Sequence, residues 1–215
     1  NQHDVERTRQ LFAAALRYPL PVGLADYGIK SSFTEFKQQP YLVFLHGTTW
    51  ESKLYPEAYW QELIKLAAID GLEVKLLWGD EDELLRAKRL AANYRHVEVM
   101  PKLNYRDIAA LLAAAKAAIA VDTGLGHLAA AVDCPTLSLF GSTNSGLSGA
   151  YGKDQRHLAG TLSCCPCLRR QCTLHSGKLT IKDNSYDKNI NPPCFSTIPA
   201  DIVWLNLQLL IKKIN

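Results

Sequence analysis

VDTGLGHLAAAV, residues 121–132, runs from a short apolar segment through an acid, a hydroxyl and a glycine into an alanine-rich helix. The turn consists of Asp122, Thr123 and Gly124, and His127 lies just inside the helix. Such a turn can be a plain helix cap, in which a side-chain oxygen accepts from a free N–H group. It can also bind an anion, because a helix N-terminus offers unpaired N–H groups and a positive dipole end. The surrounding sequence has to decide between the two.

Apolar segments alternate with helical patterns on both sides of this turn. The expected strands are 41–46, 74–79, 97–101, 117–122 and 135–141, and the expected helices are 56–71, 81–94, 104–116 and 124–132. Short apolar strands separated by helices predict an α/β fold, a Rossmann-like doubly wound parallel sheet that is covered on both faces. We expect right-handed crossovers and the strand order 3-2-1-4-5.

The flanking segments suggest how the chain is divided. We assign 1–35 to an interdomain helix and linker, because a helical pattern there is followed by Pro and Gly breaks. We assign 36–215 to one domain, with a cysteine-rich segment at 160–195 and a closing amphipathic helix at 198–214. The opening residues read as a helix entered from upstream, so we expect that the natural protein continues before Asn1.

The composition excludes several classes of protein. The 215 residues are 47% hydrophobic and 21% charged, as is ordinary for a globular protein. A net charge of +3 gives no support to nucleic-acid binding. No apolar run reaches the roughly 18 residues of a membrane span. No signal-peptide pattern is visible, so we expect a reducing, cytoplasmic environment.

Two polar loops are expected to meet at one edge of the sheet. In an open parallel sheet, the ligand lies beyond the carboxyl ends of the strands, where the strand order reverses. That point lies between the loop HGTTWESKLYP (46–56) and the loop DTGLGH (122–127). The groups that these loops offer to a phosphate are the hydroxyls of Thr48, Thr49 and Thr123, the ammonium of Lys53 and the backbone N–H groups from Gly124 onward. We expect Asp122 to turn aside and to accept from N–H groups or hold a donor in place.

Each of these residues also has an ordinary structural interpretation. Asp122 and Thr123 could simply cap the helix. Lys53 could be a solvated surface lysine, and His127 could be a histidine of the core. Glu83 could be a first-turn helix carboxylate and nothing more. The convergence of the loops nevertheless favours nucleotide or phosphate binding. The absence of G-x-G-x-x-G after the first strand counts against an NAD-dependent dehydrogenase or a nucleotide-dependent epimerase.

Four segments together resemble one family. They are HGTTWESKLYPEAYW (46–60), LLWGDEDELLRAKRLA (76–91), VMPKLNYRDIAALLAAAKAAIAVDTGLGHLAAA (99–131) and LFGSTNSGLSGAYGKDQ (139–155). They are similar to the C-terminal half of the bacterial lipopolysaccharide heptosyltransferases, glycosyltransferase family 9, with the nearer likeness to the heptosyltransferase I branch. The resemblance covers about residues 1–155. Small departures are Tyr55, where the family has Trp, and Gly126, where it has Ser or Ala.

The resemblance implies a fold and a set of site residues. The expected architecture is GT-B, in which two Rossmann-like domains face a central cleft and the C-terminal one, here 36–215, binds ADP-heptose. Lys53 is expected to stabilise the leaving diphosphate, Glu83 to bind the ribose, and 100–103 to flank the adenine. The full set of expected donor-binding residues is Thr48, Thr49, Lys53, Glu83, Leu103, Asp122, Thr123, Gly124, Leu125 and His127. No metal and no cofactor is implied.

The resemblance also implies an enzymatic reaction. It is the inverting transfer of L-glycero-D-manno-heptose from ADP-heptose to Kdo of the lipopolysaccharide inner core. The general base and most of the acceptor site are expected in an N-terminal domain that these residues do not contain. The expected protein is a monomer, peripheral on the cytoplasmic face of the inner membrane, with Kdo-lipid A as acceptor. Basic residues that could help to dock this acidic acceptor are Lys102, Arg106, Lys153, Arg156, Arg169 and Arg170, although they could equally be ordinary solvated surface charges.

Alternatives remain open at this point. The chain could belong to heptosyltransferase II or to a later-acting heptosyltransferase, or it could be a non-catalytic module that binds a sugar nucleotide. The cysteine-rich segment is a separate question. Cys164, Cys167, Cys172 and Cys194 follow one another with spacings of 2, 4 and 21 residues. Such a group can be a metal site, a pair of disulfides or a set of free thiols.

Overall fold

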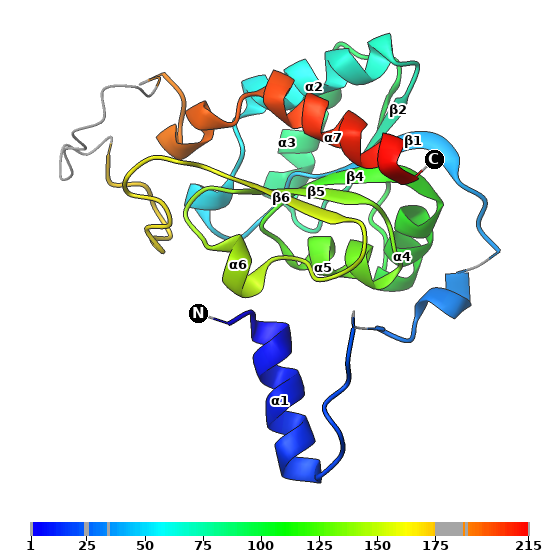
Figure 1. Ribbon diagram of the computed structural model, residues 1–215. Helices are drawn as coiled ribbons and strands as arrows, with labels where there is room; N and C mark the ends of the chain where they lie inside the picture. The colour runs from blue at the N-terminus through cyan, green and yellow to red at the C-terminus, as the bar shows by residue number, and fades with distance from the viewer. Residues whose placement is uncertain (1, 24–25, 34, 175–186, 188, 215) are drawn as a thin grey trace.

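The computed structural model describes residues 2–23, 26–33, 35–174, 187 and 189–214. Its centre is a six-stranded parallel sheet in the order β3-β2-β1-β4-β5-β6 (Figure 1). The strands are β1 (Gln39–Leu45), β2 (Glu73–Leu76), β3 (Val97–Val99), β4 (Ala115–Val121), β5 (Thr136–Phe140) and β6 (Gln155–Ala159). The predicted order of the first five strands is therefore confirmed.

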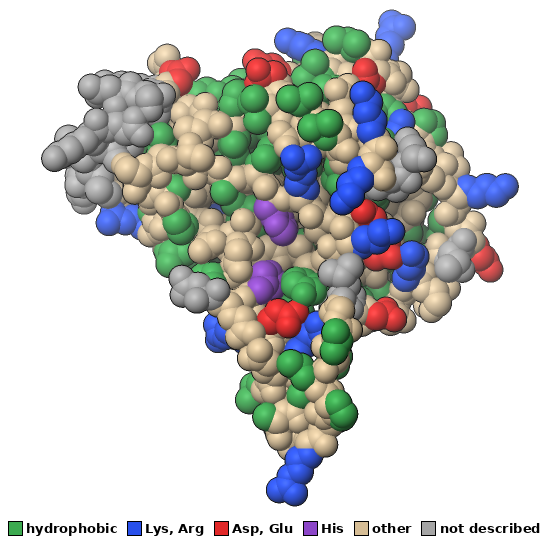
Figure 2. Space-filling view, in the orientation of Figure 1, with side chains coloured by type: hydrophobic (Ala, Val, Ile, Leu, Met, Phe, Trp, Pro, Cys, Tyr) green, Lys and Arg blue, Asp and Glu red, His purple; other side chains and the backbone are tan. Residues whose placement is uncertain are grey.

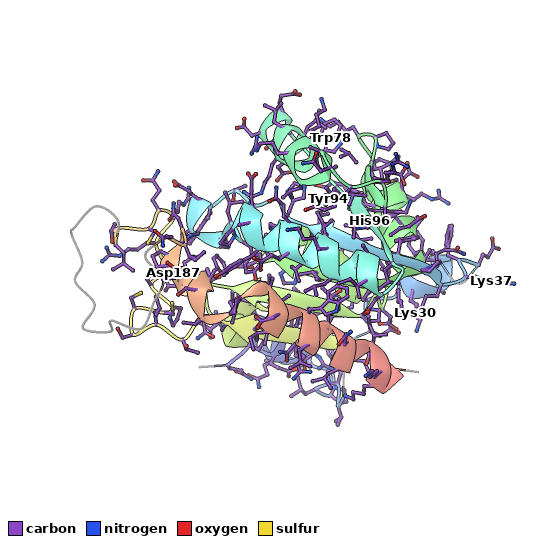
Figure 3. All side chains as sticks on the ribbon, turned by 90° about the horizontal axis from the view of Figure 1, so that it is seen from above. Lys30, Lys37, Trp78, Tyr94, His96 and Asp187 are labelled. Carbon is purple, nitrogen blue, oxygen red and sulfur yellow. The ribbon has the colours of Figure 1, made fainter. Side chains whose placement is uncertain are left out.

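Helices cover both faces of this sheet. The α-helices are α1 (Asp4–Leu16), α2 (Glu57–Ile69), α3 (Glu81–Ala91), α4 (Tyr105–Ala114), α5 (Gly124–Ala131), α6 (Ser145–Ser148) and α7 (Ala200–Ile214). Short 3-10 turns occupy η1 (Lys30–Phe33), η2 (Glu51–Lys53) and η3 (Pro193–Thr197). Helices α2, α3 and α7 lie on one face, and α4 and α5 lie on the other (Figure 1). Seen from above, α2 and α7 lie side by side over the strands (Figure 3).

The period of two along the central strands explains the two cores. On β1, Leu42 and Phe44 point into the core under α2 and α7, whereas Val43 and Leu45 point into the core under α4. All four are buried almost completely. Successive side chains of a strand point to opposite faces, so a strand between two helical layers must be apolar at every position. The continuous apolar runs in the sequence are the direct result.

The structure corrects several predicted boundaries. Helix α4 ends at Ala114 instead of 116, and β4 begins at Ala115 instead of 117. Strand β6 was not predicted at all. Its sequence QRHLA contains a single aliphatic residue longer than alanine, and it lies at the edge of the sheet with no residue fully buried. An edge strand needs no continuous apolar run, so the hydrophobic pattern gave no signal there.

Helix α1 projects from the body of the molecule (Figure 1). Its buried residue is Ala13, whereas Leu11, Phe12 and Leu16 are all more than half exposed. Figure 2 shows hydrophobic side chains on the projecting part of the surface. The helix is joined to the body at its start, where the His3 ring lies 3.0 Å from the Gly149 carbonyl oxygen. Within the described residues, no helix is long and apolar enough to cross a membrane.

Candidate functional site

The two loops predicted to meet do lie together at the carboxyl ends of β1 and β4. The Nζ atom of Lys53 lies 2.7 Å from the Asp122 carboxylate. The hydroxyl of Thr48 donates to the backbone carbonyl of Asp122 over 3.1 Å. Because β1 and β4 are neighbours in the sheet, their following loops emerge beside each other at the point where the strand order reverses. The predicted meeting of the two loops is confirmed.

Lys53 is half enclosed by its neighbours in this arrangement. Its side chain is only 16% exposed and that of Asp122 only 11%, so the interpretation as a solvated surface lysine is wrong. The Nζ atom also lies 4.4 Å from the centre of the Trp50 ring, a cation–π contact. The hydroxyl of Thr143 donates to the same Asp122 oxygen over 2.7 Å. The ammonium is therefore positioned by an aromatic face and by a carboxylate that is itself fixed.

Thr143 is a site residue that the sequence interpretation missed. It lies in the loop that follows β5, next to the loop that follows β4. The signal was available, because polar residues directly follow this apolar strand as they follow strands one and four. The expectation that Asp122 would turn aside and hold a donor in place is confirmed, since it pairs with Lys53 and Thr143.

The start of α5 is open toward the site. Thr123 occupies the N-cap position, but its side chain makes no capping hydrogen bond. The simple capping interpretation of this residue is therefore wrong, and its hydroxyl remains available to a ligand. A Cβ atom added to Gly124 would meet nothing within 4 Å. Free N–H groups at the first turn of a helix and open space in front of them suit a phosphate group.

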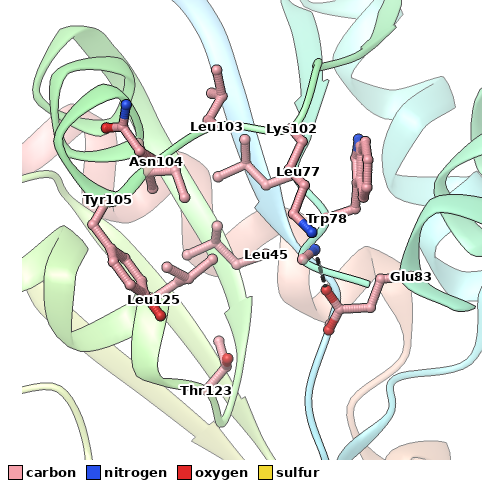
Figure 4. A pocket seen from close by; sticks show the side chains of 13 residues that line it. Leu45, Leu77, Trp78, Glu83, Lys102, Leu103, Asn104, Tyr105, Thr123 and Leu125 are labelled. Atoms are coloured by element: carbon pink, nitrogen blue, oxygen red, sulfur yellow. Dashed lines mark hydrogen bonds between the residues drawn. The ribbon is translucent and has the colours of Figure 1, made fainter. Parts of the chain in front are cut away.

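A cavity of about 500 Å³ extends from Thr123 along the ends of β1 and β2 (Figure 4). Leu45, Leu77, Leu103, Leu125 and Ile108 form its apolar wall. The polar side chains that line it include those of Glu83, Lys102, Asn104 and Thr123. A slot with apolar walls and a few polar groups suits a flat heterocyclic base that is attached to a sugar.

Glu83 links the loops that follow β1 and β2. The Asp80 side chain caps α3 by accepting from the Glu83 N–H over 2.9 Å. The Glu83 carboxylate in turn accepts from the Gly79 N–H over 2.7 Å. It also lies directly over Gly47, where an added Cβ atom would come within 2.0 Å of its Oε1 atom. Glu83 is thus more than a first-turn carboxylate, because it lines the cavity wall with one oxygen still free to accept.

A second cavity of about 520 Å³ adjoins the first across Gly47 and Glu83. Thr48 and Thr49 line it together with charged residues of the first turns of α3 and their neighbours. Its arginines already have partners. Arg86 donates to the Tyr55 carbonyl, and Arg89 forms a salt bridge with Glu57 over 2.7 Å. The two cavities share Gly47 and Glu83 in their linings, and we call them together the trough.

Two histidines near the site behave differently. His127 is exposed on α5, so the interpretation as a core histidine is wrong, and it lines neither cavity. Partial burial lowers its pKa, while the charge of Asp122 acts to raise it. His46, at the end of β1, is fully buried, and burial together with the nearby Arg86 charge lowers its pKa to about 4. His46 is therefore a neutral core residue at pH 7.

The basic residues singled out in the sequence do not form one patch. Lys102 lines the first cavity and lies over the Trp78 ring at 5.8 Å, and Arg170 lies over the Trp50 ring at 5.4 Å. Arg106, Lys153 and Arg156 line neither of the two cavities. Of the six, Lys102 alone lines one of the two cavities, whereas Arg170 shares the Trp50 ring with Lys53.

Five of the cysteines lie in one region but are not joined, whereas Cys134 lies in the core under α4 and α5; the five are Cys164, Cys165, Cys167, Cys172 and Cys194. All six are free thiols in the structure. A hydrogen bond with Cys194 lowers the pKa of Cys165 to about 7, and burial raises the pKa of Cys164 to about 11. Over the described part of the chain, no group of His, Cys, Asp or Glu is arranged to hold a metal ion.

Comparison with known proteins adds an independent line of support. Residues 1–177 match the family described as glycosyltransferase family 9 (heptosyltransferase). Lipopolysaccharide heptosyltransferase 1 of Pseudomonas aeruginosa is 49% identical over 214 residues, which cover 98% of this chain and 59% of that protein. The protein of the same name from Escherichia coli K12 is 48% identical over 157 residues, which cover 72% of this chain and 49% of that protein.

Solved structures agree with this result. The E. coli heptosyltransferase WaaC with ADP has a TM-score of 0.70 and 46% identity, over 74% of this chain and 51% of that one. E. coli ADP-heptose lps heptosyltransferase II, at 20% identity, has a TM-score of 0.62 over 91% of this chain and 55% of that one, a likeness of fold alone. The chain spans about half the length of the curated relatives it matches.

Proposed function

The chain belongs to glycosyltransferase family 9, and on that premise we propose that it is the donor-binding half of a lipopolysaccharide heptosyltransferase of type I. The observation that carries this proposal is the Lys53–Asp122 pair directly before Thr123, a residue that lines a slot that suits a nucleotide. The E. coli heptosyltransferase WaaC has been solved with ADP and with ADP-2-deoxy-2-fluoro heptose, in two structures that align with this chain at 46% and 44% identity. We infer that residues 36–215 form the nucleotide-sugar domain and that 1–35 link it to an acceptor domain.

The shape of the trough suggests how the donor binds. The adenine enters the apolar slot beside Leu103, and the free oxygen of Glu83 accepts from a ribose hydroxyl. The diphosphate then lies where Lys53, Thr123 and the N–H groups of Gly124 and Leu125 converge. The heptose extends toward Thr48 and Thr49, which line the second cavity. His127 lies one turn behind these groups and contributes to the local field.

The proposed reaction is inverting heptosyl transfer from ADP-heptose to Kdo on lipid A. As the bond from the sugar to oxygen breaks, negative charge develops on the leaving diphosphate. Lys53 and the start of α5 stabilise this charge, because fixed donors in a partly water-excluded site need no reorganisation during the reaction. Deprotonation of the acceptor hydroxyl requires a general base, which we assign to the acceptor domain. Because this acceptor is a membrane lipid, we expect the working enzyme to be peripheral at the cytoplasmic face of the inner membrane. We expect it to act as a monomer.

Ligand-induced thermal stabilisation tests the proposal directly. The chain is heated with ADP, ADP-heptose, UDP-sugars or NAD. We expect ADP and ADP-heptose to raise the melting temperature and the others to have little effect. Lys53→Ala should abolish the shift, whereas Lys65→Ala, which changes an exposed lysine on α2, should preserve it. Stabilisation by NAD in preference to ADP would reject the assignment.

A second measurement separates binding from transfer. We expect the 215 residues alone to bind ADP-heptose without moving heptose to a Kdo-lipid A acceptor, because the proposed base is supplied by the acceptor domain. The readout is the mass of the acceptor after prolonged incubation with the donor. Turnover by this polypeptide alone would show that the base lies within these residues.

A further inference from the structure

The diphosphate site lacks surplus positive charge. Lys53 is paired with Asp122, so this pair carries no net charge. The second cavity is lined by four carboxylates, Glu51, Asp80, Asp82 and Glu83, and its two arginines are already engaged. Lys102 lies over Trp78 and lines the first cavity but not the second. A nucleoside diphosphate carries at least two negative charges at neutral pH, so its binding calls for another cation near Lys53.

One further segment is attached directly to the loops that hold Lys53 and Asp122. We name residues 168–170 the arginine strap. The Ser52 N–H donates to the carbonyl of Arg170 over 3.0 Å, and the Ser52 hydroxyl donates to the carbonyl of Arg169. On the other side, the Leu168 N–H donates to the carbonyl of Ser142 over 2.8 Å. Ser52 and Ser142 are both buried, and their hydroxyl oxygens are 2.9 Å apart.

These attachments place the arginine strap beside the residues that form and hold the Lys53–Asp122 pair. Ser52 directly precedes Lys53, and Ser142 directly precedes Thr143, which holds Asp122. The strap therefore bridges the same two loops that fix the ion pair. Its contacts use backbone carbonyl and N–H groups, so they do not depend on which side chains the strap carries.

The side chains of Arg170 and Lys53 contact the same aromatic ring, that of Trp50. Its guanidinium carbon lies 5.4 Å from the centre of the Trp50 ring, and Lys53 Nζ lies 4.4 Å from the same point. The two cations are thus no farther apart than the sum of these distances. A guanidinium stacked on an aromatic ring keeps its N–H groups free at its edge, in a fork that matches phosphate oxygens. Within the described residues, no carboxylate forms a salt bridge with Arg170.

We propose that Arg170 is a second cation of the diphosphate site and binds the terminal phosphate of the nucleotide beside Lys53. This inference rests on the proposed function of the trough as a nucleotide-sugar site. Both cations lie against the Trp50 ring, and the backbone hydrogen bonds of the arginine strap hold Arg170 at this position. Arg169, its neighbour in sequence, is turned elsewhere, because its guanidinium donates to the Thr173 hydroxyl over 2.8 Å.

Calorimetric titration of the chain with ADP, AMP and adenosine tests the proposal. For Arg170→Gln we expect ADP to bind about tenfold to a hundredfold more weakly, the effect of losing one charged hydrogen-bonding group. AMP and adenosine lack the terminal phosphate, so their affinities should change less than about threefold. Arg170→Lys should fall between the two, because it keeps the charge but loses the planar fork. Arg169→Gln is the matched control and should bind ADP as the unaltered chain does.

The outcomes separate this proposal from the one on which it rests. If the unaltered chain does not bind ADP, the proposed function itself fails. If it binds ADP and Arg170→Gln binds it equally well, the inference is overturned. An equal loss for ADP, AMP and adenosine would also overturn it, since that pattern indicates a general disturbance of the fold. Thermal melts of each variant without ligand identify such a disturbance, and the backbone attachments of the strap are retained in all of them.

Discussion

The pairing of Lys53 with Asp122 leads to a double-mutant prediction. Lys53→Met removes the ammonium and leaves a carboxylate that is 11% exposed, with the Thr143 hydroxyl as its donor. Breaking a buried ion pair in this way typically costs 3–5 kcal/mol. Some water can still reach this site, so we expect about 3 kcal/mol, the lower end of that range.

The second single variant, Asp122→Asn, and the double variant should both lose less stability than Lys53→Met. Asp122→Asn leaves an ammonium that still lies against Trp50 and is 16% exposed, so it can turn to water. We expect a cost of about 1–2 kcal/mol. Lys53→Met combined with Asp122→Asn leaves no uncompensated charge and should cost about 1 kcal/mol. The double variant should thus be less destabilised than the two single variants added together by about 3–4 kcal/mol, the coupling energy of the pair.

Urea unfolding of the four proteins at pH 7.5 measures this coupling. Calorimetric titration with ADP on the same samples then separates stability from binding. Both proteins that lack Lys53 should bind ADP at least tenfold more weakly, since a charged hydrogen bond contributes about 1.5–3 kcal/mol. The double variant should therefore recover stability but not affinity. A coupling energy below about 0.5 kcal/mol would refute the reasoning about the pair.

Three further predictions concern the core and the thiols. Tyr55→Phe should lower stability by about 1–2 kcal/mol in urea unfolding, because the buried hydroxyl donates to the Ile198 carbonyl; an unchanged midpoint would contradict this. The folded pKa of His46 is about 4 and the ordinary value is 6.5, so the unfolded chain takes up a proton that the folded chain refuses. Stability should fall by up to about 1.4 kcal/mol per pH unit as pH drops from 6.5 toward 4, and His46→Gln should flatten this slope in unfolding measured at pH 7 and pH 5. Iodoacetamide at pH 7 should modify Cys165 before Cys164, because their pKa values are about 7 and about 11; peptide mass spectrometry that finds the reverse order would exclude this difference.

The sequence predicted those strands of the fold whose residues are buried on both faces of the sheet. Strands β1 and β4 are covered on both faces, so nearly every residue is apolar and the segments are visible as runs. Strand β6 is an edge strand with half-buried residues, and its sequence looks like a polar connector. It pairs with β5 from Gln155 opposite Thr136 to Ala159 opposite Phe140, residues that are distant in the sequence. No local pattern in the sequence encodes such pairing.

The position of the site was predictable for a topological reason. Strand order alone places the loops after β1 and β4 together, so Thr48, Lys53, Asp122 and Thr123 could be assigned to one edge before any coordinates were known. The contacts among them were less accessible. That Thr143 would share the carboxylate of Asp122 depends on the conformation of the loop after β5, which has no periodic pattern. The approach of Arg170 to Trp50 depends on a segment more than a hundred residues away in the chain.

The Asp122 carboxylate lies beside a proposed phosphate site, where its negative charge would oppose anion binding. The hydrogen-bond donors around it explain how both can be accommodated. Asp122 would repel a diphosphate if its charge were free, but in the structure it accepts from Lys53 and Thr143. An ammonium has three N–H donors, and the contact with Asp122 uses one of them. A donor that faces neither Asp122 nor the Trp50 ring therefore remains for a phosphate oxygen without breaking the ion pair. The carboxylate thus lowers the net charge of the site but fixes the direction of the ammonium, and the N–H groups of α5 and the guanidinium of Arg170 must supply the attraction that it removes.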